Sequence, residues 1–77
     1  MKDRRVLARY KGEHIVMELS KVRCMDRRSS LERDSYEIRI KDDGHDICNP
    51  ALFFDEKAAG QYALTVILSE GLTEVEL

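Results

Sequence analysis

The side chains of this chain that could hold a metal ion are two histidines and two cysteines. His45 and Cys48 stand in an H-x-x-C spacing, and His14 and Cys24 fall in the segment before them. Zinc takes four nitrogen or sulfur ligands, usually from closely spaced pairs. His14 and Cys24 are ten residues apart, roughly 33 Å along an extended strand, so they cannot both reach one site without a sharp bend. We therefore expect no metal, with Cys24 as a small buried thiol and His45 in a turn.

The serines and aspartates suggest no catalytic arrangement. Ser29, Ser30 and Ser35 lie in a charged segment with no histidine nearby in sequence, whereas a serine nucleophile needs a base beside it. The aspartates of residues 42–46 surround a turn, where aspartate is favoured for backbone reasons. A domain of this size also has little room for a concave pocket on the order of 300 Å³ or more. We expect no enzyme activity and no cofactor.

Charge is distributed unevenly along the chain. Residues 1–41 carry twelve Lys and Arg against seven Asp and Glu, whereas residues 42–77 carry one Lys against eight Asp and Glu. The two parts therefore have formal charges of +5 and −7, which sum to the net charge of −2. Such a split steers partners when the parts occupy different surfaces, because local potential acts at contact range. The alternative is that the two parts attract each other within the fold.

Alternation of apolar and polar residues predicts an antiparallel sheet in the first half of the chain. Residues 5–11 alternate with period two, and residues 14–25 are apolar and β-branched enough for a long strand. The apolar phase of that long strand changes partway, which predicts a β-bulge near Ser20 and Lys21. Residues 26–35 are polar and aperiodic and predict a loop.

The sheet pattern continues after this loop. Residues 36–41 alternate cleanly and predict the third strand, and residues 42–44 supply an Asp-Gly turn. A short fourth strand through Ile47 should follow, and residues 51–54 should form an apolar edge that closes the core. Residues 73–77 alternate again, which leaves open a short last strand or a frayed end.

A helix is predicted between Asp55 and Gly71. Asp55 is a favourable N-cap, and Glu56 places a negative charge in the first turn, where the helix dipole stabilises it. Gly71 suits the left-handed position that ends many helices. No proline interrupts the residues between them.

These elements predict one α+β domain over residues 1–77. We expect a three- to four-stranded antiparallel sheet with one C-terminal helix packed on one face and the short final strand as an option. A domain this small buries only about 60% of the surface that its unfolded chain exposes, so a partner subunit would add to its stability. The predicted core consists of Val6, Ala8, Tyr10, Ile15, Met17, Leu19, Val22, Ile38, Ile40, Ile47, Phe53, Ala59, Ala63, Val66 and Ile67.

The N-terminus is charged and leads into only a short apolar run. That composition differs from a secretory signal, and no stretch approaches the roughly eighteen apolar residues of a membrane span. We therefore expect a cytoplasmic protein with two free thiols and no membrane partner. The alternative is a single Cys24–Cys48 disulfide, if strands place the two side by side.

The predicted helix is apolar over more of its circumference than one sheet can cover. A stripe around Ala59 and Ala63 can lie on the sheet, and Leu64 and Leu68 extend the apolar arc to roughly 240°. We expect the surplus to form a homodimer or protein-partner interface. Its candidate residues are Leu64, Leu68, Leu72, Val75 and Leu77. The alternative is that the tail residues of this set fold back over the two helix leucines.

Basic residues gather on the predicted solvent side of the sheet and in the loop. The candidate nucleic-acid contacts are Arg5, Arg9, Lys11, Arg27, Arg28, Arg39 and Lys41. A sheet covered by a helix on one side and lined by Arg and Lys on the other could follow a phosphate backbone. However, an antiparallel sheet is normally polar on its solvated side. Tyr10 and Tyr36 also fall on the inward side, so the aromatic platform of single-strand readers is missing.

The sequence therefore predicts a non-catalytic interaction module, homodimeric through its C-terminal helix or bound to another protein. Nucleic-acid binding over the basic sheet face and the 26–35 loop is the alternative. A small enzyme with its site at a subunit interface is the third reading.

Overall fold

The computed structural model describes residues 4–26, 31–47 and 49–76, with the backbone alone for residues 24–26 and 31–32. Within these residues the chain forms six strands and one helix, and the α+β class is confirmed. The elements are β1 (Arg4–Lys11), β2 (Ile15–Asp26), β3 (Leu31–Asp42), β4 (His45–Asp46), β5 (Ala51–Phe53), α1 (Glu56–Glu70) and β6 (Thr73–Val75).

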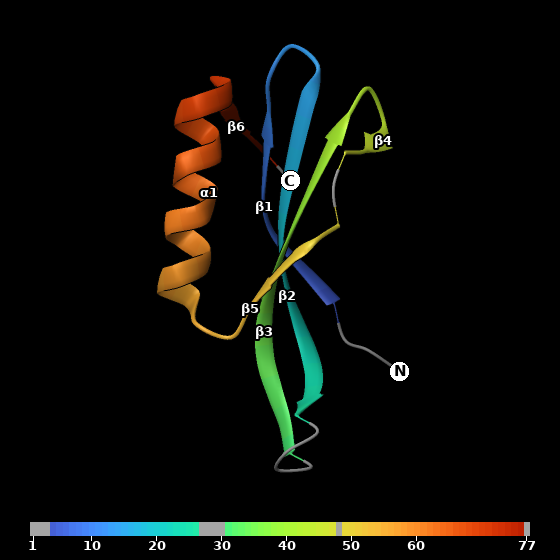
Figure 1. Cartoon of the computed structure of the whole chain (residues 1–77), viewed down its shortest axis with the longest axis vertical. Coiled ribbons are helices and arrows are strands. Elements are labelled where there is room, and N and C mark those ends of the chain that lie inside the picture. The colour runs from blue at the N-terminus through green and yellow to red at the C-terminus, as the bar shows by residue number, and fades with distance from the viewer. Residues whose placement is uncertain (1–3, 27–30, 48, 77) are drawn as a thin grey trace.

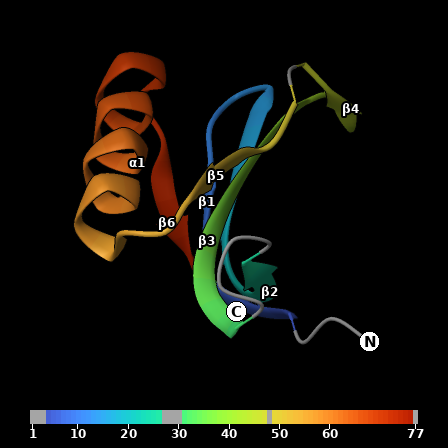
Figure 2. The same ribbon diagram turned by 60° about the horizontal axis from the view of Figure 1, so that its bottom comes forward.

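The strands form one antiparallel sheet in the order β4-β3-β2-β1-β6, with β5 also paired to β3. The helix α1 covers one face of this sheet (Figure 1). A view along another direction separates the two layers, with α1 on one side and the strands on the other (Figure 2). We call the side away from α1 the outer face. The helix α1 lacks the length and apolar content needed to span a membrane.

The β-bulge lies in β1, and its prediction in the second strand was wrong. Val6 pairs with Ser20 and Ala8 pairs with Leu19, so Leu7 is the extra residue. The pairing of β2 with β3 runs without a shift along both strands. Because side chains alternate along a strand, the bulge places Val6 on the outer face and Ala8 on the helix side. The prediction of Val6 as a residue of the core under the helix was therefore wrong.

Val22 is buried, as predicted, but on the outer face. It pairs with Arg4 and Ser35, and the Ser35 hydroxyl donates a hydrogen bond to the Val22 carbonyl oxygen at 2.9 Å. Ser20 and Ser35 are buried beside it. The serine side chains are short, so longer side chains around them can exclude water. The burial of Val22, Ser20 and Ser35 therefore does not require contact with the helix.

The prediction of a loop over residues 26–35 was wrong at residue 26 and over residues 31–35, and residues 27–30 lie outside the described residues. Strand β2 continues to Asp26 and β3 begins at Leu31, with Asp26 paired to Leu31. The distal halves of β2 and β3 extend past the N-terminal end of α1 as a two-stranded ribbon (Figure 1). A ribbon beyond the helix has no apolar partner layer, so its sequence lacks the apolar alternation that marks a half-buried strand. Backbone pairing forms these strands regardless of that polarity.

The turn at residues 42–44 is confirmed. Asp43 and Gly44 both have positive φ, at 49° and 85°, as a two-residue hairpin of this type requires. The fourth strand, however, ends at Asp46, and Ile47 is 54% exposed, so its prediction as a core residue was wrong. The chain leaves the sheet there because β5 takes the next part of the same edge, pairing residues 51–53 with residues 36–38 of β3.

Both predicted ends of the helix are confirmed. The Asp55 carboxylate accepts a hydrogen bond from the Lys57 backbone N–H at 3.1 Å. Gly71 has φ of 64°, and its N–H reaches the Ile67 carbonyl oxygen. After this cap the chain turns back, and β6 pairs with Arg9, Tyr10 and Lys11 of β1, so the short final strand is present.

The core lies between α1 and the sheet. Its buried members are Met17, Ile38, Ile40, Ala59, Ala63 and Leu72. Half-buried apolar residues packed around them are Tyr10, Ile15, Leu19, Tyr36, Ala51, Phe53, Val66 and Ile67. Ala59 and Ala63 let the helix approach the sheet closely, and Phe53 contacts Tyr62 with ring centroids 5.4 Å apart. Leu72, Tyr36 and Ala51 are core residues that the sequence prediction omitted.

Candidate interaction surfaces

The exposed side of α1 carries a strip formed by Gly60, Leu64 and Leu68, which we call the leucine strip. Residues four apart lie above one another on a helix, so these three share one line along its surface. Leu64 is 54% exposed and Leu68 is 75% exposed. Two large apolar side chains therefore remain in solvent on the side of the helix that does not face the sheet.

No contact or backbone angle in the described part of the chain requires a glycine at position 60. A Cβ atom placed on it meets nothing within 4 Å, and its φ is not positive. Glycine in a helix interior costs about 1 kcal/mol relative to alanine, because it loses more backbone freedom. The absence of a side chain therefore leaves a shallow dip at this end of the leucine strip.

Lys57 continues the strip toward the start of the helix. It is the one lysine of the acidic part of the chain, residues 42–77. A positive charge in the first turn of a helix lies at the unfavourable end of the dipole. The structure gives Lys57 no ion pair among the residues it describes.

The described part of the C-terminal tail, residues 72–76, does not cover the leucine strip. Leu72 is 6% exposed and packs in the core beneath the helix, so it is unavailable for an interface. Gly12 makes room for it, since a Cβ on Gly12 would lie 2.7 Å from Leu72 Cδ2. Val75 is half-buried in β6 opposite Arg9, at the edge of the sheet. Leu77 lies outside the described residues.

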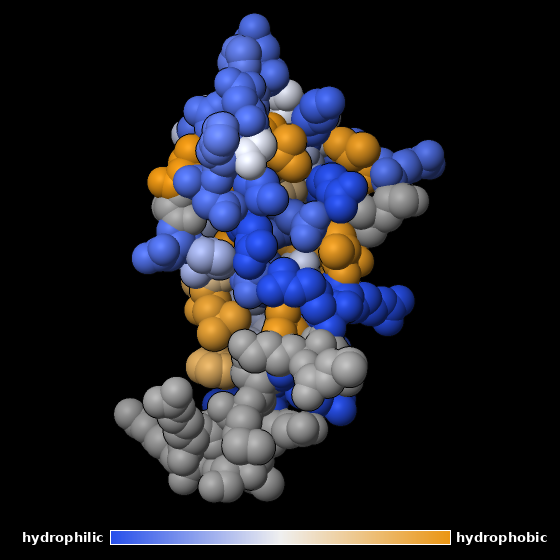
Figure 3. Space-filling view, turned by 90° about the vertical axis from the view of Figure 1, so that its right-hand side faces the viewer, coloured by the Kyte–Doolittle hydropathy of each residue, from blue (hydrophilic) through white to orange (hydrophobic). Residues whose placement is uncertain are grey.

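The outer face of the sheet carries four of the predicted basic residues, Arg9, Lys11, Arg39 and Lys41. Figure 3 shows this side as mostly hydrophilic, with apolar residues in separate patches. A small cavity of about 180 Å³ lies there, lined by Val16, Glu18, Arg39 and Lys41.

Ion pairs offset the positive charge of the arginines on the outer face in part, whereas Lys11 and Lys41 make no ion pair among the described residues. Arg4 donates two hydrogen bonds to the Glu37 carboxylate, at 2.9 and 3.1 Å. Arg39 approaches the same carboxylate at 3.3 Å, and Arg9 pairs with Glu18 at 2.9 Å. Exposed pairs of this kind contribute only about 0–1 kcal/mol to stability, but each offsets a positive charge that a phosphate would otherwise meet.

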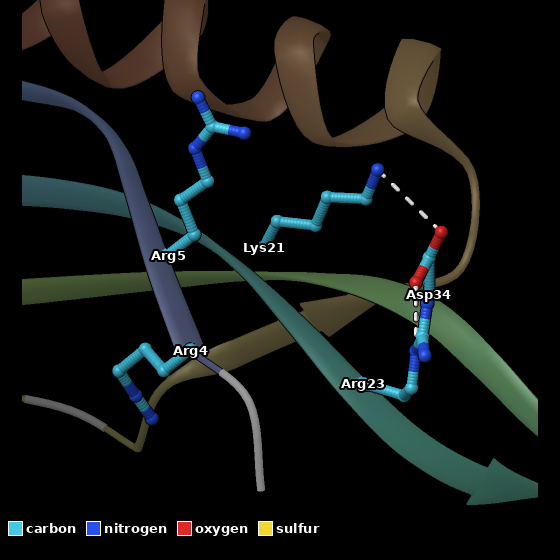
Figure 4. Close-up of a pocket in the computed structure, with 5 residues that line it drawn as sticks. All are labelled: Arg4, Arg5, Lys21, Arg23 and Asp34. Carbon is cyan, nitrogen blue, oxygen red and sulfur yellow. Dashed lines mark ion pairs between the residues drawn. The ribbon is translucent and has the colours of Figure 1, made fainter.

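Arg5 lies on the helix side of the sheet, away from the position the sequence predicted. The bulge at Leu7 moves the Arg5 side chain to the opposite face of the sheet, where Arg5 pairs with Lys21 of β2. There it lines a pocket of about 250 Å³ formed by Arg4, Arg5, Lys21, Arg23 and Asp34 (Figure 4). We call this the ribbon pocket, because it opens where the β2–β3 ribbon leaves the helix.

The ribbon pocket holds one carboxylate among four cationic side chains. Asp34 pairs with Lys21 at 3.5 Å and with Arg23 at 3.6 Å. Arg4 points away from Arg5 in Figure 4. Its guanidinium pairs with Glu37 of β3. The predicted contacts Arg27 and Arg28 fall outside the described residues, so the structure neither adds them to this pocket nor removes them.

No group of three His, Cys, Asp or Glu side chains suited to a metal ion occurs in the described part of the chain. His14 bonds to Asp43, with 3.2 Å between Nδ1 and Oδ1. Cys48 and the side chain of Cys24 are outside the description, so the structure places neither the H-x-x-C motif nor a disulfide. Among the serines weighed as nucleophiles, Ser35 is fully buried and so cannot meet a substrate.

Comparison with protein-family models, with curated proteins and with solved structures gave no match for this chain.

Proposed function

We propose that this protein is a non-catalytic interaction module that forms a homodimer through the exposed side of α1. The observation that carries the proposal is the exposure of Leu64 and Leu68 on a helix whose tail packs beneath it instead of over it. Burial of these two side chains in a second copy would remove apolar surface from water at both ends of a symmetric contact.

The leucine strip is complementary to itself when two helices pack antiparallel. A two-fold axis beside Leu64 sets residues four positions before and after it opposite each other. Leu68 then lies over Gly60 of the partner subunit, and Leu64 meets Leu64 of the partner subunit. The missing Cβ of Gly60 leaves the space that the opposing leucine needs, and residues at intervals of four form the ridge used in the commonest helix packing.

Charge also favours the antiparallel orientation. Lys57 lies near the N-terminal end of the strip, so in this arrangement it approaches the C-terminal end of the partner helix. That end carries the negative pole of the helix dipole. The cation that is unfavourable at the start of its own helix is therefore favourable beside the partner.

The expected affinity is modest. Complete burial of a leucine side chain contributes about 1.5–3 kcal/mol, and the four leucines of the pair are already half to one quarter buried in the single chain. The leucines thus contribute on the order of 5 kcal/mol, which is close to the lower end of the cost of association, about 4 kcal/mol. A dimer at about 1 mM therefore needs further contacts along the two helices, and it dissociates on dilution.

Sedimentation equilibrium between about 10 µM and 1 mM tests the proposal. We expect a monomer–dimer equilibrium that Leu68→Glu or Leu64→Glu abolishes while circular dichroism and thermal unfolding show an intact fold. Ser69→Glu is the matched control, because it adds the same charge one residue along the helix, on a side about 100° away. A wild-type protein that stays monomeric throughout, or equal dissociation by Ser69→Glu, would overturn the proposal.

Nucleic-acid binding over the outer face has less support. Arg9 and Arg39 are the central cations of that face, and both lie beside glutamates that offset their charge.

A further inference from the structure

We propose that the ribbon pocket, through Arg5, Lys21 and Arg23, binds phosphate groups of a DNA duplex. The inference goes beyond the proposed dimer and involves none of its contacts, because the leucine strip faces away from the sheet and the pocket lies on the sheet itself.

Positive charge in the ribbon pocket exceeds what its own carboxylate can offset. Arg5, Lys21 and Arg23 line it on the helix side with Asp34 as the single lining acid, whereas the fourth lining cation, Arg4, pairs with Glu37. Within the described residues Arg5 makes no ion pair. A guanidinium without a carboxylate beside it, next to a second cation on the adjacent strand, is suited to a bound anion.

The pairs inside the pocket are also longer than those on the outer face. Lys21 and Arg23 approach Asp34 at 3.5 and 3.6 Å, whereas charge-assisted hydrogen bonds are typically about 2.7–2.9 Å long. On the outer face Arg4 and Arg9 reach their glutamates at 2.9 Å. At Lys21 an entering phosphate would therefore compete with one long carboxylate pair, whereas at Arg4 and Arg9 it would compete with shorter pairs.

The shape of this region favours an extended polyanion over a small phosphorylated ligand. All five lining residues are charged, so no aromatic or apolar side chain is present to hold a base or an acyl chain. Cations continue around to the outer face, where Arg33 lies over the Phe54 ring at 4.7 Å from its centroid. One small ligand could not contact both sides of the strands.

The β2–β3 ribbon supplies a reason for duplex DNA in particular. A two-stranded antiparallel ribbon fits the major groove of B-DNA, whereas the major groove of duplex RNA is too narrow for it. Cations at the base of such a ribbon would meet the phosphates that border the groove. The net charge of −2 does not oppose this, because eight of the acidic residues belong to the segment 42–77 and the local potential steers association.

Fluorescence anisotropy with a labelled mixed-sequence duplex of about 20 base pairs tests the site over about 50–200 mM salt. Each phosphate contact adds about 0.9 to the slope of log affinity against log salt, so Arg5→Gln and Lys21→Gln should each reduce that slope by about 0.9. At about 0.1 M salt the same loss corresponds to roughly eightfold weaker binding. Asp34→Asn should strengthen binding, because it removes the competing carboxylate.

Matched controls are Lys11→Gln and Lys41→Gln, which remove the same charge from the outer face and should leave affinity nearly unchanged. Inorganic phosphate and single-stranded DNA of the same length complete the comparison. No binding at low salt, equal loss in the outer-face controls, or tighter binding to inorganic phosphate or to the single strand than to the duplex would overturn the inference. Retained binding by Leu68→Glu would separate this result from that of the dimer.

Discussion

Replacement of Gly60 by alanine distinguishes an exposed leucine strip from one packed in a dimer. The substitution should stabilise the single chain and destabilise the proposed dimer. In the single chain the new Cβ meets nothing within 4 Å, so only helix propensity changes. Alanine is about 0.8–1.0 kcal/mol more favourable than glycine inside a helix. For a domain of this size such a gain raises the unfolding temperature by about 4–8 °C.

In the dimer the same Cβ occupies the space into which Leu68 of the partner subunit packs. Overfilling a packed contact costs about 1–3 kcal/mol, and a two-fold interface contains the contact twice. We therefore expect the dissociation constant to rise at least about thirtyfold. A substitution that stabilises the fold while dissociating the assembly cannot be explained by partial unfolding.

The assay needs two concentrations of the same protein. Thermal unfolding followed by circular dichroism at a few micromolar reports on the single chain, and sedimentation equilibrium at high concentration reports on association. Thr65→Ala is the control, because it also raises helix propensity but lies away from the strip, where its hydroxyl bonds to the Gln61 carbonyl oxygen. Unchanged or tighter association of Gly60→Ala would refute the antiparallel packing on Gly60.

Three further substitutions test how the fold is held together. Leu72→Ala should lower the free energy of unfolding by about 2–5 kcal/mol in urea titrations, because Leu72 is a buried core residue; a surface-like loss below 0.5 kcal/mol would contradict its placement. Asp55→Ala should cost about 0.5–2 kcal/mol, because the Lys57 N–H loses its acceptor; amide exchange at Lys57 should quicken with it. Gly71→Ala should cost about 1–2 kcal/mol through the strain of φ at 64°, whereas a neutral effect would mean that the helix ends differently.

The features that the sequence predicted correctly are those set by local chemistry. Asp55 and Gly71 end the helix because a capping carboxylate and a left-handed glycine act on neighbouring backbone groups. Asp43 and Gly44 form their hairpin turn for the same kind of reason. The exposure of Leu64 and Leu68 could also be predicted, since it follows from the spacing of residues on a helix and from the width of one sheet contact.

The features that the sequence did not predict depend on contacts between distant segments. Leu72 follows the helix cap in a short polar tail, and only the pairing of β6 with β1 brings it under the helix beside Gly12. Strand β5 becomes a strand because the edge of β3 is free to accept it. The sequence predicts a loop in place of the distal ribbon, because the residues of the ribbon face no apolar layer. Polarity alone cannot distinguish a solvated strand pair from a loop.

The position of the bulge decides where the basic residues lie. When the apolar alternation of two paired strands falls out of phase, one extra residue in either strand restores it. The sequence shows the change of phase but does not show which strand contains the extra residue. Here it is Leu7 of β1, so the residues of β2 keep their alternation while those before Leu7 exchange faces. Arg5 thereby leaves the outer face, where glutamates offset the arginines, and joins Lys21 in a pocket with a single carboxylate. A shift of one residue in register thus moves Arg5, a residue of the proposed phosphate site, from one side of the sheet to the other.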